Sequence, residues 1–127
     1  MSAGYKTSPV GIYTMSATDT ATTATHDWTF IIPCDSTVLA ITASALTHTS
    51  GTYGAQQGTL DILGTAGNRA FPSQGTAEIV KGSSLSNRKL LRGTVLHIIF
   101  KATYNQAQVT VILRPEKQVN LNPSDDA

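Results

Sequence analysis

The feature that most constrains this fold is residues 93–115, two strand-length segments whose apolar side chains lie on both faces. Successive side chains of an extended strand point to opposite faces of a sheet. In the first segment, one face carries Leu96, Ile98 and Phe100, and the other carries Val95 and Ile99. Because a polar turn separates the segments, we expect a β-hairpin that must be covered on both sides.

The hairpin offers two sets of apolar side chains, and either could face the core. The first set consists of Leu96, Ile98, Phe100, Val109, Val111 and Leu113. The second consists of Val95, Ile99 and Ile112. One set should pack inside the domain, and we expect the other to form a contact between subunits. The alternative is that the leader or the tail of the same chain folds over the second face.

Further short strands are predicted along the chain, separated by turn-forming residues. They cover residues 26–32, 36–46, 59–64 and 76–82, with the first stopped by Pro33 and a glycine-punctuated loop at 47–58. No segment shows the apolar spacing of a long helix, and we expect a loop at 83–93. The pattern predicts an all-β fold, an antiparallel β-sandwich or jelly-roll-like small barrel with an extended N-terminal arm.

The domain organisation follows from composition. Residues 1–25 are rich in Thr, Ala, Ser and Asp, and we expect an arm that is either flexible or donated to a neighbouring subunit. Its apolar anchors would be Tyr5, Val10, Ile12 and Tyr13. Residues 26–115 should form the sandwich, and residues 116–127 a polar tail.

Charge is scarce, since Asp, Glu, Lys and Arg make up 13% of the residues, about half of the usual roughly 25%. Weak repulsion between copies favours self-association. The net charge of +1 gives no general attraction to nucleic acid. No run is long and apolar enough for a membrane span, and the first residues lack the apolar segment of a signal peptide. We therefore expect a chain made in the cytoplasm, with no membrane partner.

The basic residues are unevenly placed. Six of them occur between positions 81 and 114 without an intervening acid: Lys81, Arg88, Lys89, Arg92, Lys101 and Arg114. One interpretation is a solvated face and loop. The other is a docking patch for an acidic protein surface or for phosphate. Sparse aromatic residues argue against single-stranded nucleic acid as the partner.

Candidate catalytic or metal-binding groups do not form a known pattern, so we predict no enzyme activity, no cofactor and no metal site. Cys34 cannot form a disulfide within one chain, and we expect it to be buried and inert. His26 and Asp27 should form a hydrogen-bonded surface pair. His48 should be a solvated loop residue. For His97 we expect partial burial with a satisfied hydrogen bond, with a pH-sensitive subunit contact as the alternative.

Glycan or host-surface binding is the alternative function. Polar loops place an aromatic ring, which could stack on a sugar, near amide groups that could bind its hydroxyls. These residues are Tyr53, Gln56, Gln57 and Asn68. Under this hypothesis the chain would be a receptor-binding tip.

Two segments carry a resemblance of pattern to a group of known proteins: "IIPCDSTVLAITASAL" and "LLRGTVLHIIFKATYNQAQVTVILRP". Together with the Thr/Ala-rich leader, the low charge and the single cysteine, they resemble small structural proteins of tailed-bacteriophage virions. These are capsid decoration (cement) proteins and the β-domain bases of head spikes or fibres. The likeness covers residues 28–115, and the longer middle loops and the tail depart from it.

The resemblance implies a viral, non-enzymatic structural protein located in the virion. It implies a homo-oligomer, commonly a homotrimer, docked on the major capsid protein or another virion protein. An extended arm of such a protein can add a strand to a neighbour's sheet edge.

Overall fold

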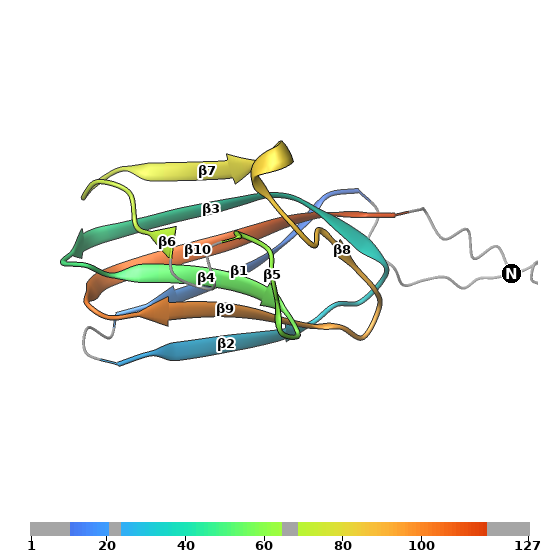
Figure 1. The fold of residues 1–127 in the computed structure, drawn as a ribbon, viewed down its shortest axis with the longest axis horizontal. Coiled ribbons are helices and arrows are strands. Elements are labelled where there is room, and N and C mark those ends of the chain that lie inside the picture. The colour runs from blue at the N-terminus through green and yellow to red at the C-terminus, as the bar shows by residue number, and fades with distance from the viewer. Residues whose placement is uncertain (1–10, 21–23, 65–68, 117–127) are drawn as a thin grey trace, which may run out of the picture.

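A computed structural model describes residues 11–20, 24–64 and 69–116. They form two antiparallel sheets packed face to face, which confirms the predicted all-β sandwich (Figure 1). The regular elements in these ranges are ten strands and one short 3₁₀ helix, η1 (Gly82–Ser84). Alternating burial along the longer strands explains why they form, because each hides one row of side chains between the sheets.

Sheet A has the strand order β1-β10-β3-β7, with β8 paired to the start of β3. Its strands are β1 (Tyr13–Asp19), β10 (Tyr104–Pro115), β3 (Ser36–His48), β7 (Ala77–Lys81) and β8 (Lys89–Leu90). Sheet B has the order β2-β9-β4-β5, with β6 also paired to β4. Its strands are β2 (His26–Ile31), β9 (Val95–Lys101), β4 (Thr52–Gln57), β5 (Leu60–Asp61) and β6 (Arg69–Ala70).

The hairpin predicted for residues 93–115 is wrong. β9 pairs with β2 and β4 in sheet B, whereas β10 pairs with β1 and β3 in sheet A. The connection after Lys101 therefore carries the chain from one sheet to the other, so the inner faces of β9 and β10 meet across the core. A hairpin would have set the two strands side by side and left each with a second face to cover.

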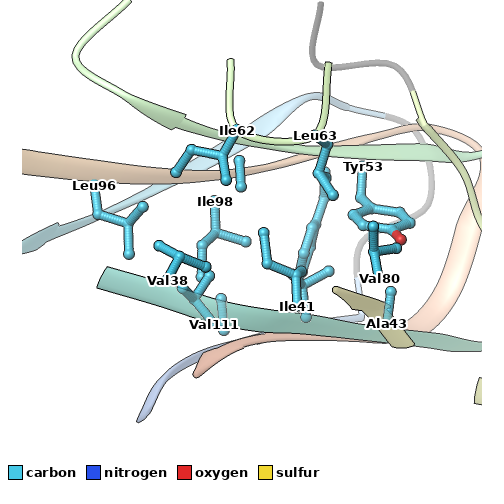
Figure 2. Close-up of a cluster of buried hydrophobic side chains, with 14 of the residues drawn as sticks. Val38, Ile41, Ala43, Tyr53, Ile62, Leu63, Val80, Leu96, Ile98 and Val111 are labelled. Atoms are coloured by element: carbon cyan, nitrogen blue, oxygen red, sulfur yellow. The ribbon is translucent and has the colours of Figure 1, made fainter. Parts of the chain in front are cut away.

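The core settles which apolar set of these strands is internal. Leu96, Ile98, Phe100, Val109, Val111 and Leu113 are all 0% exposed, and they pack with Val38, Ile41, Ile62 and Val80 (Figure 2). The subunit contact predicted for these six side chains is therefore wrong, because the same chain already buries them. Val95, Ile99 and Ile112 lie on the outer faces and are half-buried. Their role in a subunit contact stays a prediction.

The prediction of an N-terminal arm over residues 1–25 is wrong for residues 13–19, which form β1. Residues 13–19 pair along their full length with β10 of the same chain. The small side chain of Ala17 is buried against the core, and Met15 packs on it. A Thr-rich segment can join a sheet because only its alternate residues must be apolar. Of the predicted anchors, Tyr13 is half-buried in this strand and Ile12 is exposed, while Tyr5 and Val10 lie outside the described residues.

The loop between β3 and β4 depends on Gly51. A Cβ at this position would lie 2.4 Å from the carbonyl oxygen of Thr103, in the connection between β9 and β10. The same carbonyl accepts a hydrogen bond from the Thr49 amide at 3.1 Å. The chain therefore needs glycine here so that the loop can lie against the crossing between the sheets.

We predict that Gly51→Ala lowers the free energy of unfolding by about 2–3 kcal/mol, because backbone atoms cannot move aside as a flexible side chain could. The control is Gly75→Ala, where φ is +76° but a Cβ meets open space, and there we expect a loss of about 1 kcal/mol. Urea unfolding measures both values. Equal losses would contradict the packing role assigned to Gly51.

Candidate functional site

Five of the six predicted docking residues lie at one end of the sandwich. This end is formed by the last residue of β7, by β8, and by the end of β10 (Figure 1). Pairing brings Arg114 and Lys89 to opposite sides of Thr37 at the start of β3. Lys81, Arg88 and Arg92 belong to the segments next to these residues. The fold therefore gathers bases that are up to 33 positions apart into one region, which we call the basic end.

Hydrogen bonds fix the backbone of the basic end. Nε of Arg88 donates to the carbonyl of Val38 at 3.1 Å, and the amide of Val38 donates to the Arg88 carbonyl at 2.8 Å. The backbone amide of Arg92 donates to Oδ1 of Asp35 at 2.8 Å. Nζ of Lys89 lies 3.5 Å from Oε1 of Glu116. The side chains of Lys81, Arg92 and Arg114 are exposed, so their charges face solvent.

Lys101, the sixth predicted docking residue, lies elsewhere. It is the last residue of β9 and pairs with Thr52 at the opposite end of the sandwich (Figure 1). The prediction of one docking patch is thus wrong for this residue. The strand direction of β9, which runs away from the basic end, is the reason.

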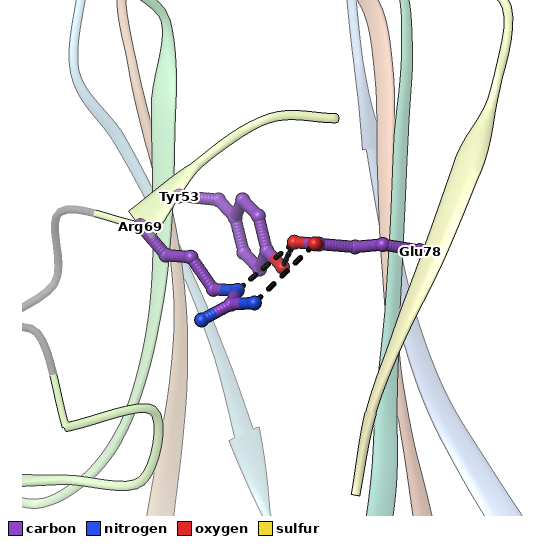
Figure 3. Close-up of polar contacts among 3 residues, drawn as sticks. All are labelled: Tyr53, Arg69 and Glu78. Carbon is purple, nitrogen blue, oxygen red and sulfur yellow. Dashed lines mark hydrogen bonds and ion pairs between the residues drawn. The ribbon is translucent and has the colours of Figure 1, made fainter. Parts of the chain in front are cut away.

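At the far edge of the sandwich, a polar cluster joins the two sheets. The hydroxyl of Tyr53 in β4 donates to the carboxylate of Glu78 in β7, and Nε of Arg69 in β6 donates to the same oxygen at 3.0 Å (Figure 3). Nη2 of Arg69 reaches the second oxygen at 3.4 Å. We call these three residues the Tyr–Glu–Arg clasp. It connects the inner face of sheet B to the edge of sheet A.

The clasp removes Tyr53 from consideration as a sugar-binding residue, because its side chain is 0% exposed. Its ring packs against Phe71, with centroids 5.0 Å apart. Gln57 is also used internally, since its amide nitrogen donates to the carbonyls of Asn87 and Lys89. Gln56 donates to Asp61 at 2.9 Å, and Asn68 lies outside the described residues. The alternative of a glycan site centred on Tyr53 therefore conflicts with the burial of that ring.

Burial shifts the pKa of three tyrosines. The pKa of Tyr53 is raised, first by burial and then by the hydrogen bond to the Glu78 carboxylate. The pKa of Tyr104 is raised to about 12 by burial and by the nearby Asp19 carboxylate. Burial also raises the pKa of Tyr13, although its hydrogen bond to Ser36 acts in the opposite direction. The pKa of Arg69 is raised by its hydrogen bond to Glu78, so the clasp holds its cation firmly.

His26 and His97 each pair with an aspartate from another strand. Nδ1 of His26 bonds to the buried carboxylate of Asp19, at the end of β1, and not to Asp27. Asp27 instead binds Nδ1 of His97 at 3.0 Å on the outer face of sheet B. The predicted His26–Asp27 pair is wrong, because adjacent strand residues point to opposite faces. The partial burial and hydrogen bonding expected for His97 are confirmed. His48 ends β3 and is not a loop residue.

Cys34 is buried, as expected. Its Sγ lies 3.7 Å from Oγ of Ser36, which in turn donates to the Cys34 carbonyl at 2.7 Å. The hydroxyl of Tyr13 lies 2.5 Å from the same Oγ. These bonds tie the start of β1 to the turn before β3.

Beyond the row of Arg114, Thr37 and Lys89 at the basic end, the outer face of sheet A carries little charge. Register places three rows of side chains across β1, β10, β3 and β7. The rows are Thr14, Ile112, Ala40 and Lys81; Ser16, Thr110, Thr42 and Ile79; and Thr18, Gln108, Ser44 and Ala77. Among these twelve side chains only Lys81 is charged, and it belongs to the basic end.

The described residues contain no group of three or more His, Cys, Asp or Glu placed to hold a metal ion. A shallow hollow of about 380 Å³ between β3 and the loop before β7 is lined by residues without an ionisable side chain: Ser44, Ala45, Leu46, Gly75, Thr76, Ala77 and Gln106. Within the same described ranges, no helix has the length and apolar character needed to cross a membrane.

Comparison with known proteins gives no relative: no family model, no curated protein and no solved structure matches this chain.

We predict that Glu78→Ala lowers the free energy of unfolding by about 2–3 kcal/mol, because it leaves the buried Tyr53 hydroxyl without an acceptor. Glu78→Gln keeps an acceptor oxygen and should cost less. The control is Glu116→Ala, which removes the exposed ion pair with Lys89 and should cost about 0–1 kcal/mol. Chemical denaturation measures all three. A Glu78→Ala loss no larger than the control's would mean that the clasp does not stabilise the sandwich.

We also predict that stability falls as the pH rises above about 10. An unfolded tyrosine ionises near pH 10, whereas Tyr104 in the folded chain ionises near pH 12 and Tyr53 is shifted in the same direction. The unfolded state therefore loses protons first, and the stabilisation present below pH 10 is lost as the pH approaches 12. Absorbance at 295 nm should show less tyrosinate in the folded chain than in denaturant at pH 11. Identical titrations would contradict the burial of these hydroxyls.

Proposed function

We propose that this chain is a non-enzymatic structural protein of a bacteriophage virion. Copies of it assemble with one another, and the basic end docks on an acidic surface of the major capsid protein or another virion protein. The observation that carries the proposal is the gathering of five bases at one end of the sandwich, where they outnumber the two acids Asp35 and Glu116: Lys81, Arg88, Lys89, Arg92 and Arg114. The virion part of the proposal rests on the resemblance of residues 28–115 to decoration proteins and spike bases.

The charge distribution favours a protein partner approached end-on. Cations at one end attract an acidic surface and orient the chain on it. The three rows of outer side chains of sheet A beyond the row of Arg114 stay available for other contacts, because they carry one charge among twelve side chains. Exposed Ile79 in the middle row adds apolar area to this face. A low-charge face beside a basic end suits a protein that packs among its own copies on a larger scaffold.

The docking test uses the double variant Arg92→Glu and Arg114→Glu, together with capsid shells of the virus that encodes the chain. The wild type should co-sediment with the shells, and the double variant should bind roughly 10-fold or more weakly, because two attractions become repulsions. The backbone bond between Arg92 and Asp35 remains in the variant. The control is Lys101→Glu, which makes one such change at the opposite end and should bind nearly as the wild type does.

Analytical ultracentrifugation of the full chain tests the assembly part. A self-associating chain is expected, and a trimer is what the resemblance implies. A wild type that neither sediments with shells nor associates with itself would refute the proposed function. Binding that also fell for Lys101→Glu would show that docking does not depend on the basic end.

A further inference from the structure

One side of the sandwich is closed and the other is open. On the closed side, beyond β4 and β7, loop residues cover the core and are at most 6% exposed: Ile62, Leu63, Phe71 and Leu85. The Tyr–Glu–Arg clasp spans the sheets on this side (Figure 3). On the open side, β1 and β2 each pair with one strand, so within the described residues both have an unpaired edge (Figure 1).

Apolar side chains between these two edge strands are incompletely buried. Trp28 is the cross-strand neighbour of Ile98, which is 0% exposed, so Trp28 points inward, yet it is 43% exposed. Phe30 lies opposite Leu96 and Met15 opposite Val111, and both are only partly buried against the core. An inward-facing tryptophan with this exposure marks a core that continues to the surface of the molecule. We call this region, with β1 and β2, the open seam.

Apart from the inward-facing carboxylate of Asp19 at the end of β1, the two edge strands lack the features by which sheets avoid pairing with others. Natural edges are commonly protected by lysine, proline or a bulge. β1 reads YTMSATD and β2 reads HDWTFI, without Lys, Arg or Pro. Their two acids are engaged, Asp19 with His26 and Asp27 with His97. Ile31, at the end of β2, is 63% exposed.

We propose that the open seam pairs with the open seam of a second copy of this chain, around a two-fold axis. A single peptide could pair with one edge, whereas a second copy presents two edges and a matching apolar seam. Antiparallel pairing of identical strands sets the acidic start of β2 against the uncharged end of the partner's β2. In β1, the end that carries Asp19 likewise meets the end that carries Tyr13. Like charges are thereby kept apart.

This inference rests on the self-association in the proposed function and specifies its surface. A contact around a two-fold axis joins copies in even numbers, such as a dimer or a hexamer made of two trimers. Each copy would then contribute to two continuous sheets, and Trp28 would be covered from both sides. The amides of β2 that face away from β9 would gain hydrogen-bond partners.

The experiment compares the full wild-type chain with Thr29→Lys, at an exposed outward position of β2. Two lysines meeting across the axis should raise the dissociation constant roughly 10-fold or more in sedimentation equilibrium. The control is Thr59→Lys, an exposed threonine on the closed side, with Ser16→Lys at the exposed middle of β1, where the two copies of the strand also meet, as a second test variant. Far-UV circular dichroism checks that each variant is folded. Hydrogen exchange of β2 amides in the wild type should slow as the concentration rises.

The outcomes separate the two proposals. An even-numbered assembly weakened by Thr29→Lys and Ser16→Lys, but not by Thr59→Lys, supports the open-seam pairing. A simple trimer, or an assembly that both lysines leave unchanged, overturns this pairing and leaves the proposed function standing. A wild type that stays monomeric at high concentration overturns the pairing and also removes self-association from the proposed function.

Discussion

The packing of the inner face of β9 against the inner face of β10 is the interaction on which the rest of this structure depends. The crossing between these strands places one in each sheet, and side chains such as Ile98 and Val111 then meet in the core. Burying each such side chain is worth about 1.5–3 kcal/mol. The crossing also decides the edges, because β2 and β1 add to the outer sides of β9 and β10. Both open edges therefore fall on the same side of the sandwich.

The two sides of the sandwich are stabilised by different means. The closed side combines loops that cover the core with the Tyr–Glu–Arg clasp, in which a half-buried ion pair also satisfies a buried hydroxyl. Such an arrangement is favourable only when every polar group in it has a partner. On the open side, within the ranges that the structure describes, the His26–Asp19 contact lies at one end of the seam. If copies pair through the open seam as proposed, the fold itself would direct growth of the assembly to one side.

The sequence predicted several of the longer strands but not their neighbours, and the loop expected at 47–58 is wrong because β4 lies within it. Alternation in residues 95–101 and 104–115 indicates two strands, but a hairpin and a crossing between sheets require the same alternation around a polar turn. The choice between them depends on β2, β4, β1 and β3, which pair from distant positions. β1 was missed because Thr, Ser and Ala carry little apolar signal, although Met15 and Ala17 give it a usable inner face. The burial of Cys34 and the partial burial of His97 followed from their flanking residues.

The candidate sites show the same limit. Five basic residues meet at one end because β8 pairs with the start of β3. No local sequence pattern predicts this pairing. His26 binds Asp19, 7 residues away, and Glu78 binds Arg69, 9 residues away. Tyr53 reaches Glu78 only because the two sheets stack on each other. Tyr53 looked like an exposed loop aromatic because glycines surround it. Those glycines instead allow close packing around a buried ring.

The burial of Cys34 bears on how the chain responds to oxidising and reducing conditions. A thiol becomes reactive when it is accessible and ionised, but here the sulfur lies under the turn that precedes β3 and beside the Ser36 hydroxyl. Oxidants reach such a sulfur only after that turn opens. A copy that passes from a reducing compartment into an oxidising medium should keep its single thiol, and neighbouring copies should not become cross-linked by disulfides. If the chain assembles as proposed, disulfide formation at Cys34 would then play no part in holding the copies together.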